Sequence, residues 1–350
     1  STKQFPQLLN YSETLMKLLG SPNIASKIWV YGQYDHEVGI RTVTKPGYDA
    51  SVLRLDNGKF LSIKIDGNPK QCYINPREGA IGCFEEACRN VVCTGAKPIG
   101  MLDHLQFGNP TDPEIFWTFL ESLKGLTDFA KDFEIPCVGG KVSLYNETSD
   151  GPIKPTPVIG VIGLIDKKPL KIQKINSGDS LIMIGDTKDE LGGSEYSEYI
   201  HKFIGGKCPA VDFSESKKNM NSVLDIIENE LIKSAHDCSK GGLTIAISEL
   251  CMINQIGCNV SLEKIPGEKL DSDKILFSES HSRYLVTFEN KNLEKLEEVL
   301  KKHNVSYSLI GEFTGDSILF SSDSKPIIDL SVDKAQKTWF NSLKEMVLHA

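Results

Sequence analysis

Hydrophobic and polar positions divide the chain into helix-like and strand-like segments that alternate along its length. Apolar runs at 50–55 and 60–65 flank Asp-Asn-Gly at 56–58, and an Asn-Gly pair between such runs predicts a β-hairpin. Helical spacing over 76–94, with Pro in the first turn and Gly95 after the last, predicts a helix. The other predicted elements of the first half are a helix-rich lead-in at 1–30, a helix at 113–132, and strands at 97–107, 135–145 and 156–165.

The second half continues this alternation after a Lys-Lys-Pro stretch at 167–169, where we place a domain boundary. Its predicted elements are strands at 180–185, 282–289, 309–313 and 317–320, and helices at 220–229, 242–252, 292–303 and 332–346. Because a single core rarely grows beyond about 250–300 residues, a chain of 350 residues also indicates two domains. We expect a helical lead-in and linker at 1–40, an α+β domain with a mixed sheet at 41–166, and an α/β sandwich domain at 167–350.

Composition is typical of a soluble intracellular enzyme, with 40% hydrophobic and 25% charged residues. The net charge of −8 disfavours a nucleic-acid-binding surface. No apolar run reaches the roughly 20 residues that cross a bilayer, and the N-terminus lacks the shape of a signal peptide. We therefore expect a cytoplasmic protein with neither nucleic acid nor a membrane as a partner. The start at Ser1 without Met is typical of a processed chain or a fragment.

Nine cysteines, an odd number, are spread along the chain without a Cys-x-x-Cys pair. Zinc ligation and disulfides are possible roles, but free buried thiols in a reducing compartment fit this spacing better. The cysteines therefore also favour the cytoplasm.

The segment 137–147, Cys-Val-Gly-Gly-Lys-Val-Ser-Leu-Tyr-Asn-Glu, carries the most informative chemical pattern in the chain. Gly139 and Gly140 let the backbone approach a ligand closely, because neither has a Cβ. Lys141 and Ser143 then offer a cation and a hydroxyl, the groups that phosphate oxygens require. On these residues alone, a glycine bulge in an ordinary strand stays an alternative.

A second segment, 99–110, again runs from a strand into a carboxylate, Asp103, and a Gly-Asn-Pro turn. The two segments together resemble the phosphoribosylformylglycinamidine synthase family (formylglycinamidine ribonucleotide synthetase, PurL), which belongs to the aminoimidazole ribonucleotide synthetase superfamily. Further motifs that continue the resemblance are Tyr34–Gly39, Asp66–Pro69, Glu190–Tyr196 and His236–Leu243. The resemblance spans residues 20–345, is to the C-terminal half of the family, and implies its PurM-like architecture of two domains. One departure is Lys141, where the family has Asn.

Glu86 and Asn90 are four residues apart and project from one face of a predicted helix, where they could share a cation. From spacing alone, an exposed polar face is the simpler interpretation. The resemblance implies instead that Asp49, Glu86, Asn90 and Asp237 hold Mg²⁺ and a nucleotide, ATP or ADP, in an auxiliary site. Residues that it places beside this site with weaker support are Lys27, Asp66, Asn68, Gly192, Gly193 and Ser239.

Four residues of these motifs also have an interpretation of their own. Ser239 resembles a helix N-cap, and free N–H groups at a helix start form an anion site. The pair Gly192-Gly193 offers a phosphate cradle. A Gly-Gly pair alone is weak evidence, and here the support comes from the other motifs of the resemblance. His236 by itself is more typical of a packed structural histidine than of a base.

The same residue-by-residue match implies that Asp103, Gly139, Gly140 and Lys141 contact ATP in the catalytic site and that Ser143 contacts the substrate. Lys141 stands where the family uses a magnesium ligand. Because an ammonium cannot coordinate a cation, we expect Lys141 to place its charge directly against phosphate.

The implied reaction is ATP-dependent amidation. ATP phosphorylates the amide oxygen of formylglycinamide ribonucleotide, and ammonia from glutamine then displaces phosphate to give formylglycinamidine ribonucleotide. The family's catalytic histidines lie in a motif like His-Asn-His-Pro, which this chain lacks. The resemblance therefore implies three partners: the N-terminal half of the same enzyme, a glutaminase subunit and a small PurS-type subunit.

Because its histidines are expected in the absent half, the isolated chain is expected to turn over little or no substrate. It is also expected to form a homodimer, since a sheet surface that normally meets a twin half seeks a partner. Two alternatives stay open: a non-catalytic nucleotide-binding scaffold, and another kinase or synthetase of the superfamily.

Overall fold

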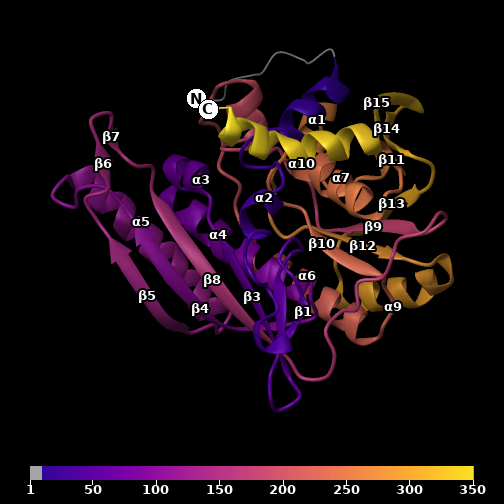
Figure 1. Ribbon diagram of the computed structural model, residues 1–350, viewed down its shortest axis with the longest axis horizontal. Coiled ribbons are helices and arrows are strands. Elements are labelled where there is room, and N and C mark those ends of the chain that lie inside the picture. Colours follow the sequence, from indigo (N-terminus) through magenta and orange to yellow (C-terminus); the bar gives the residue numbers. More distant parts are fainter. Residues whose placement is uncertain (1–9, 350) are drawn as a thin grey trace.

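The computed structural model describes residues 10–349 and contains two large mixed sheets with helices packed against them (Figure 1). The first sheet has the strand order β1-β2-β3-β8-β4-β5, and its neighbouring strands are antiparallel except for β4 and β5. Its strands are β1 (Thr42–Thr44), β2 (Ser51–Arg54), β3 (Phe60–Asp66), β4 (Lys97–Gln106), β5 (Cys137–Ser143) and β8 (Thr156–Ile165). The predicted mixed sheet of the first domain is therefore confirmed.

The hairpin predicted around Asn57-Gly58 is confirmed, since β2 and β3 pair antiparallel with Arg54 opposite Phe60. Helix α4 (Pro76–Val92) also forms where predicted, because the Asn75 side chain accepts backbone N–H groups at its start and Pro76 fits the first turn. The other helices of this half are α1 (Tyr11–Leu19), α2 (Ile28–Tyr31), α3 (Pro69–Ile74) and α5 (Pro113–Asp132). The short strands β6 (Glu147–Thr148) and β7 (Gly151–Pro152) pair with each other.

The second sheet has the order β10-β12-β9-β13-β11-β14-β15, and only β11 and β14 are parallel neighbours within it. Its strands are β9 (Ser180–Ile184), β10 (Ser234–Asp237), β11 (Cys258–Ser261), β12 (Tyr284–Phe288), β13 (Tyr307–Phe313), β14 (Ser317–Ser322) and β15 (Lys325–Ser331). Its helices are α6 (Phe213–Glu228), α7 (Gly242–Asn254), α8 (Ser272–Phe277), α9 (Leu293–His303) and α10 (Val332–Leu348).

The central strand β9 is buried on both faces and alternates between two cores. Ile182 and Ile184 join the core beneath α6 and α9, whereas Leu181 and Met183 join the core beneath α1, α7 and α10. A sheet covered on both faces by helices is an α/β sandwich, as predicted for this half.

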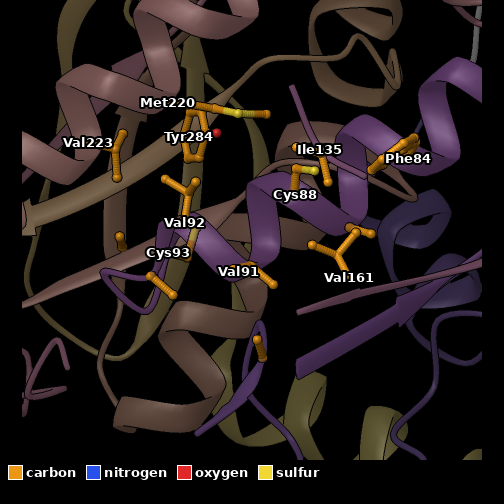
Figure 2. Close-up of a cluster of buried hydrophobic side chains, with 14 of the residues drawn as sticks. Phe84, Cys88, Val91, Val92, Cys93, Ile135, Val161, Met220, Val223 and Tyr284 are labelled. Carbon is orange, nitrogen blue, oxygen red and sulfur yellow. The ribbon is translucent and has the colours of Figure 1, made fainter. Parts of the chain in front are cut away.

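Helix α4 links the two sheets because it is buried on nearly all sides (Figure 2). Its Phe84 and Val91 belong to the same core as Val161 on β8 of the first sheet. That core continues into the second half through Met220 on α6 and Tyr284 on β12. The first domain therefore shares a continuous apolar core with one face of the second sheet.

The sequence prediction missed several short elements and one helix start. Strands β10 and β11 have four residues each, which is too short for an alternating pattern to stand out. Helix α6 begins at Phe213 rather than at 220, because the Asp212 side chain accepts the N–H of Glu215 and starts the helix earlier. Residues 1–9 of the predicted lead-in lie outside the described residues. The domain boundary at 167 stays a prediction.

The expectation for the cysteines is confirmed in outline, since all nine are free thiols. Cys137 on β5 is exposed, and the other eight are buried. Within residues 10–349, no helix combines the length and the apolar character that a membrane span needs.

One face of the first sheet carries exposed apolar side chains. Buried Met101 and Val161 point toward the helices, whereas Ile65 and Leu102 flank Gly160 on the other face and are 66% and 41% exposed. Val138 on the edge strand β5 lies close to Ile162 on the same face. We call the exposed side chains of Ile65, Leu102 and Val138 the open face.

Gly163 on β8 is a packing requirement of this fold. A Cβ at position 163 would lie 2.3 Å from Val91 Cγ1 on α4 and 2.9 Å from Ala96 Cβ. We expect Gly163→Ala to lower the free energy of unfolding by about 1–3 kcal/mol through overpacking. Gly160→Ala is the matched control on the same strand, because its Cβ would meet atoms only at 3.9 Å. Denaturant unfolding that gives both variants the same midpoint would contradict this account of the packing.

Candidate functional site

Charged and amide side chains of both halves meet where α4 passes between the two sheets. Together they form a network of hydrogen bonds and ion pairs, which we call the junction cluster. Its members are Asp49, Lys64, Asp66, Glu86, Arg89, Asn90, His236, Asp237, Lys240 and Glu249. The four residues predicted to form the auxiliary site, Asp49, Glu86, Asn90 and Asp237, all belong to it.

Asp49, just before β2, is held by the end of strand β10. Its Oδ1 accepts the backbone N–H of Asp237 at 2.9 Å and pairs with His236 Nδ1 at 2.9 Å. The other ring nitrogen of His236 lies 3.1 Å from Glu249 Oε2 on α7. His236 therefore bridges two carboxylates, which is compatible with the interpretation of a packed structural histidine.

These contacts set the charges of the pair. Burial raises the pKa of Asp49, but the charge of His236 and the hydrogen bonds outweigh burial, so the pKa of Asp49 lies below its usual value. Burial lowers the pKa of His236, but Asp49 and Glu249 outweigh burial and move it well above the usual value. The imidazole is therefore a cation and the Asp49 carboxyl is an anion at neutral pH.

Helix α4 brings Glu86 and Asn90 to the same buried side of the cluster. Asn90 Nδ2 donates to Asp237 Oδ2 at 3.1 Å and to the carbonyl oxygen of Glu86 at 2.8 Å. Both side chains are buried, so the alternative of an exposed polar helix face is excluded. The spacing prediction that both project from one helix face is confirmed.

Three side-chain cations of the chain contact this acidic group. Lys240 Nζ donates to Asp66 Oδ1 and Glu86 Oε1, each at 3.0 Å. Lys64 Nζ donates to Asn90 Oδ1 at 3.0 Å, and Arg89 donates to Asp237 Oδ2 at 3.2 Å. Arg89 also pairs with Glu85 one turn earlier on α4.

The predicted ligands for a divalent cation differ in how close together their donor atoms lie. The donor atoms of Asp49, His236 and Asp237 lie within 4.8 Å of one another, and the two carboxylates are the hard oxygen ligands that Mg²⁺ prefers. On the other side, the oxygens of Glu86 and Asn90 already contact the ammonium groups of Lys240 and Lys64. All four residues therefore contact cations of the chain, Asp49 and Asp237 offer carboxylates close together for a magnesium ion, and ligation by Glu86 and Asn90 stays a prediction.

Of two further residues with weaker support, Lys27 lies next to the cluster and Asn68 caps a helix. Burial lowers the pKa of Lys27, and its Nζ donates to the carbonyl oxygen of Asn23 at 3.1 Å. The charge of Glu249 acts on it, which places Lys27 beside the His236 side of the cluster. Asn68 is the N-cap of α3, because its side chain accepts the N–H of Gln71 at 3.2 Å.

The predicted cap of α7 is wrong. Gly241 is the N-cap, with a φ of 78°, and no side chain caps the helix, whereas Ser239 accepts the N–H of Gly242 only through its backbone carbonyl. The N–H of Gly241 donates to Glu279 Oε1 at 2.8 Å, so a carboxyl oxygen of the chain already occupies this helix start.

Glu279 belongs to a second buried group of charges around the Gly192-Gly193 segment. Its Oε1 also accepts the N–H of Glu195 at 2.8 Å, and Glu195 pairs with Lys70 of α3. A Cβ at Gly192 would lie 2.0 Å from the carbonyl oxygen of Lys207, and the φ of Gly193 is 70°. These glycines are therefore needed for packing and for the turn, and their role as a phosphate cradle stays a prediction.

The second predicted site lies on neighbouring strands β4 and β5 at the edge of the first sheet. Asp103 is in register with Gly140, and a Cβ at position 140 would lie 2.1 Å from Asp103 Oδ1, so only glycine fits. Burial raises the pKa of Asp103, although the backbone N–H of Lys141 lowers it in part. The pairing also shifts at Val138, so a bulge precedes the two glycines.

Lys141 and Ser143 follow on the exposed edge strand. Lys141 is in register with His104 of β4, which places two basic side chains together. Ser143 Oγ lies 3.3 Å from Asn146 Oδ1, and the Asn146 amide donates to the carbonyl oxygens of Ser143 and Phe107. The polar end of β4 and β5 is thus ordered and accessible, with Gly139 beside it.

Sequence reasoning missed the cations of the junction cluster. Lys64 lies in an alternating strand pattern and Arg89 in a helix, where charged residues usually face water. The position of Lys240, three residues after Asp237 in a quoted motif, was the available signal for its membership.

Comparison with known proteins defines the class of this fold. Residues 47–165 match the N-terminal domain of AIR synthase related proteins, and residues 176–322 match the C-terminal domain. The chain belongs to the AIR synthase related family, which confirms the predicted superfamily and two-domain architecture.

More particular similarity is to proteins named phosphoribosylformylglycinamidine synthase subunit PurL. The protein of that name from Methanocaldococcus jannaschii is 42% identical over 98% of this chain and 48% of its own length. The one from Alkaliphilus metalliredigens is 39% identical over 98% of this chain and 46% of its own length. The chain thus spans about half the length of the curated relatives it matches. A solved structure of T. maritima PurL complexed with FGAR has the same fold, with a TM-score of 0.77, 18% identity, and coverage of 95% of this chain and 54% of the other.

Glu279 gives the fold a pH dependence that can be measured. Burial raises the pKa of Glu279 to about 7, with Glu195 raising it and Lys70 lowering it, against about 4.3 in an unfolded chain. Since the folded state binds this proton more tightly, its contribution to stability is present in acid and is lost as the pH rises through about 7. We expect Glu279→Gln, whose Oε1 still accepts both backbone N–H groups, to gain stability relative to the wild type between about pH 5 and pH 8.

Urea unfolding at both pH values measures this difference. Glu294→Gln, an exposed position on α9, is the control and is expected to show no such change. A constant stability difference between Glu279→Gln and the wild type across this range would contradict the raised pKa.

Proposed function

We propose that the chain is the C-terminal half of a phosphoribosylformylglycinamidine synthase. The complete enzyme converts formylglycinamide ribonucleotide, ATP and glutamine-derived ammonia into formylglycinamidine ribonucleotide, ADP and phosphate. The observation that carries the proposal is the junction cluster, because Asp49, Glu86, Asn90 and Asp237 are distant in sequence yet belong to one hydrogen-bonded network. Relatives with that name, matching 98% of the chain, support it.

We infer that the junction cluster is the auxiliary nucleotide site. Asp49 and Asp237 would hold Mg²⁺, which supplies positive charge against the phosphates of ADP or ATP when bound. His236 keeps Asp49 oriented through a 2.9 Å contact, and Lys64 and Lys240 add ammonium groups on the neighbouring side. The complexes described for T. maritima PurL with ATP and with ADP support nucleotide as the ligand class.

We infer that the ends of β4 and β5 form this chain's share of the catalytic site. Gly140 leaves room for the Asp103 carboxylate, Gly139 would let a nucleotide approach the backbone at the strand edge, and the backbone N–H of Lys141 orients Asp103. The Lys141 ammonium would lie against ATP phosphate in place of a metal ligand, and Ser143 would contact the ribonucleotide substrate. The catalytic histidines would come from the N-terminal half, because phosphoryl transfer depends on positioned groups from both sides.

The open face is the surface that we assign to the partner half. Ile65, Leu102 and Val138 expose apolar area on a sheet face, and such patches mark contact surfaces. In the complete enzyme the N-terminal half would cover it, and in the isolated chain a second copy would. A structure of PurLQS from Thermotoga maritima supports further subunits, which we infer to be the glutaminase and the PurS-type subunit. The cytoplasm is the compartment that free thiols favour.

Nucleotide titration tests the auxiliary site. We expect the isolated chain to bind ADP only with Mg²⁺, and Asp49→Asn to weaken that binding about tenfold or more, because it removes the charge while keeping the Oδ1 acceptor. Isothermal titration with ADP, with and without Mg²⁺, measures both effects.

Asp333→Asn, an exposed position on α10, is the control for this titration. Equal affinities of Asp49→Asn and the wild type would refute the assignment of Asp49. If the folded wild-type chain binds no ADP, the auxiliary site is not autonomous, and the scaffold alternative is favoured.

The oligomeric state tests the open face. We expect a homodimer of the isolated chain at micromolar concentration and a monomer for Leu102→Glu, because a buried unpaired charge opposes association. Ile253→Glu is a matched control, since Ile253 on α7 is 42% exposed and Leu102 is 41% exposed. Light scattering that finds a monomeric wild type, or a dimeric Leu102→Glu variant, would count against this surface.

A further inference from the structure

One ammonium group lies between two buried carboxylates of the junction cluster. Asp66 on β3 and Glu86 on α4 belong to the first domain, whereas Lys240 precedes α7 in the second. We propose that Lys240 is a resident cation of the junction cluster, occupying the position between Asp66 and Glu86, so that this side of the cluster needs no divalent ion.

The contacts of Lys240 are those expected of a fixed counter-ion. Its Nζ lies 3.0 Å from Asp66 Oδ1 and 3.0 Å from Glu86 Oε1. The side chains of Asp66 and Glu86 are only 8% and 7% exposed, so water neutralises little of their charge. Two adjacent buried carboxylates repel each other unless a cation or a shared proton separates them. The ammonium group satisfies both oxygens at once.

Electrostatics agree with this geometry. Burial lowers the pKa of Lys240, but the charges of Asp66 and Glu86 outweigh burial and move it well above the usual value. A second cation, Lys64, contacts the Asn90 oxygen at 3.0 Å, so the side-chain oxygens of both Glu86 and Asn90 on α4 have a chain cation.

The backbone around Lys240 is fixed in the conformation that this contact needs. Gly241 and Gly242 have φ values of 78° and 69°, which favour glycine. A Cβ at position 242 would lie 2.7 Å from the carbonyl oxygen of Ser278, and the Gly241 N–H donates to Glu279 at 2.8 Å. These contacts fix the backbone of residues 241 and 242 in the second domain, and the side chain of the preceding Lys240 extends to the first domain. The pair of contacts ties the two domains together without an added ion.

Thermal unfolding of the whole chain without nucleotide tests this inference, and its outcome is independent of whether the proposed function holds. We expect a change from EDTA to millimolar Mg²⁺ to raise the unfolding temperature of Lys240→Met by more than that of the wild type. We expect Lys240→Met to unfold several degrees lower in EDTA and to recover part of that loss when Mg²⁺ is added, because the metal then neutralises Asp66 and Glu86. Adding Glu86→Gln to Lys240→Met should also recover stability, since it removes the repulsion between the carboxylates.

Lys188→Met is a matched control, because Lys188 is also 27% exposed but pairs with only one carboxylate, Glu215. It should lose less stability, and Mg²⁺ should not restore it. The inference is overturned if Mg²⁺ raises the unfolding temperature of the wild type as much as that of Lys240→Met, or if Lys240→Met is as stable as the wild type in EDTA. Should Lys240→Met fail to fold, the double variant with Glu86→Gln decides: a chain that folds supports the inference, and one that does not overturns it.

Discussion

Burial of charge along helix α4 is the constraint on which the arrangement of the two halves depends. All but two of the 17 residues of this helix are buried, and they include Glu85, Glu86, Arg89 and Asn90. Isolated charges in such a position would cost several kcal/mol each, so each requires a partner. The partners come from both sides, with Lys64 from β3 and Asp237 and Lys240 from the second half. The contacts of the junction cluster therefore also fix the position of the two halves relative to each other.

The two candidate sites differ in how far the chain completes them. In the junction cluster, anions and cations already neutralise one another, and a continuous apolar core surrounds the helix that carries them. At the ends of β4 and β5, by contrast, the carboxylate of Asp103 and the side chains of Lys141 and Ser143 lie on an edge strand with little cover. The ends of β4 and β5 are accessible to another chain or domain. The junction cluster, in contrast, is enclosed between the two halves of this chain.

Local sequence signals predicted the elements that carry these sites. The β2–β3 hairpin follows from Asn57-Gly58 at its turn, and α4 follows from helical spacing after Pro76. The spacing of Glu86 and Asn90 correctly placed both on one helix face, but it could not tell whether that face meets water or protein. Ser239 illustrates the same limit, because its pattern fits an N-cap while packing of Gly242 against Ser278 makes Gly241 the cap.

The sequence by itself determined most of the strands, the main helices, the family and the four acidic or amide residues that meet in the junction cluster, because these depend on local periodicity and on motifs read in order. Only the tertiary structure decided which charges neutralise them. Lys240 and Glu86 are separated by 154 positions, yet their side chains lie 3.0 Å apart. Such pairings depend on how the two sheets pack around α4, and no local pattern encodes the distance between groups so far apart in the chain.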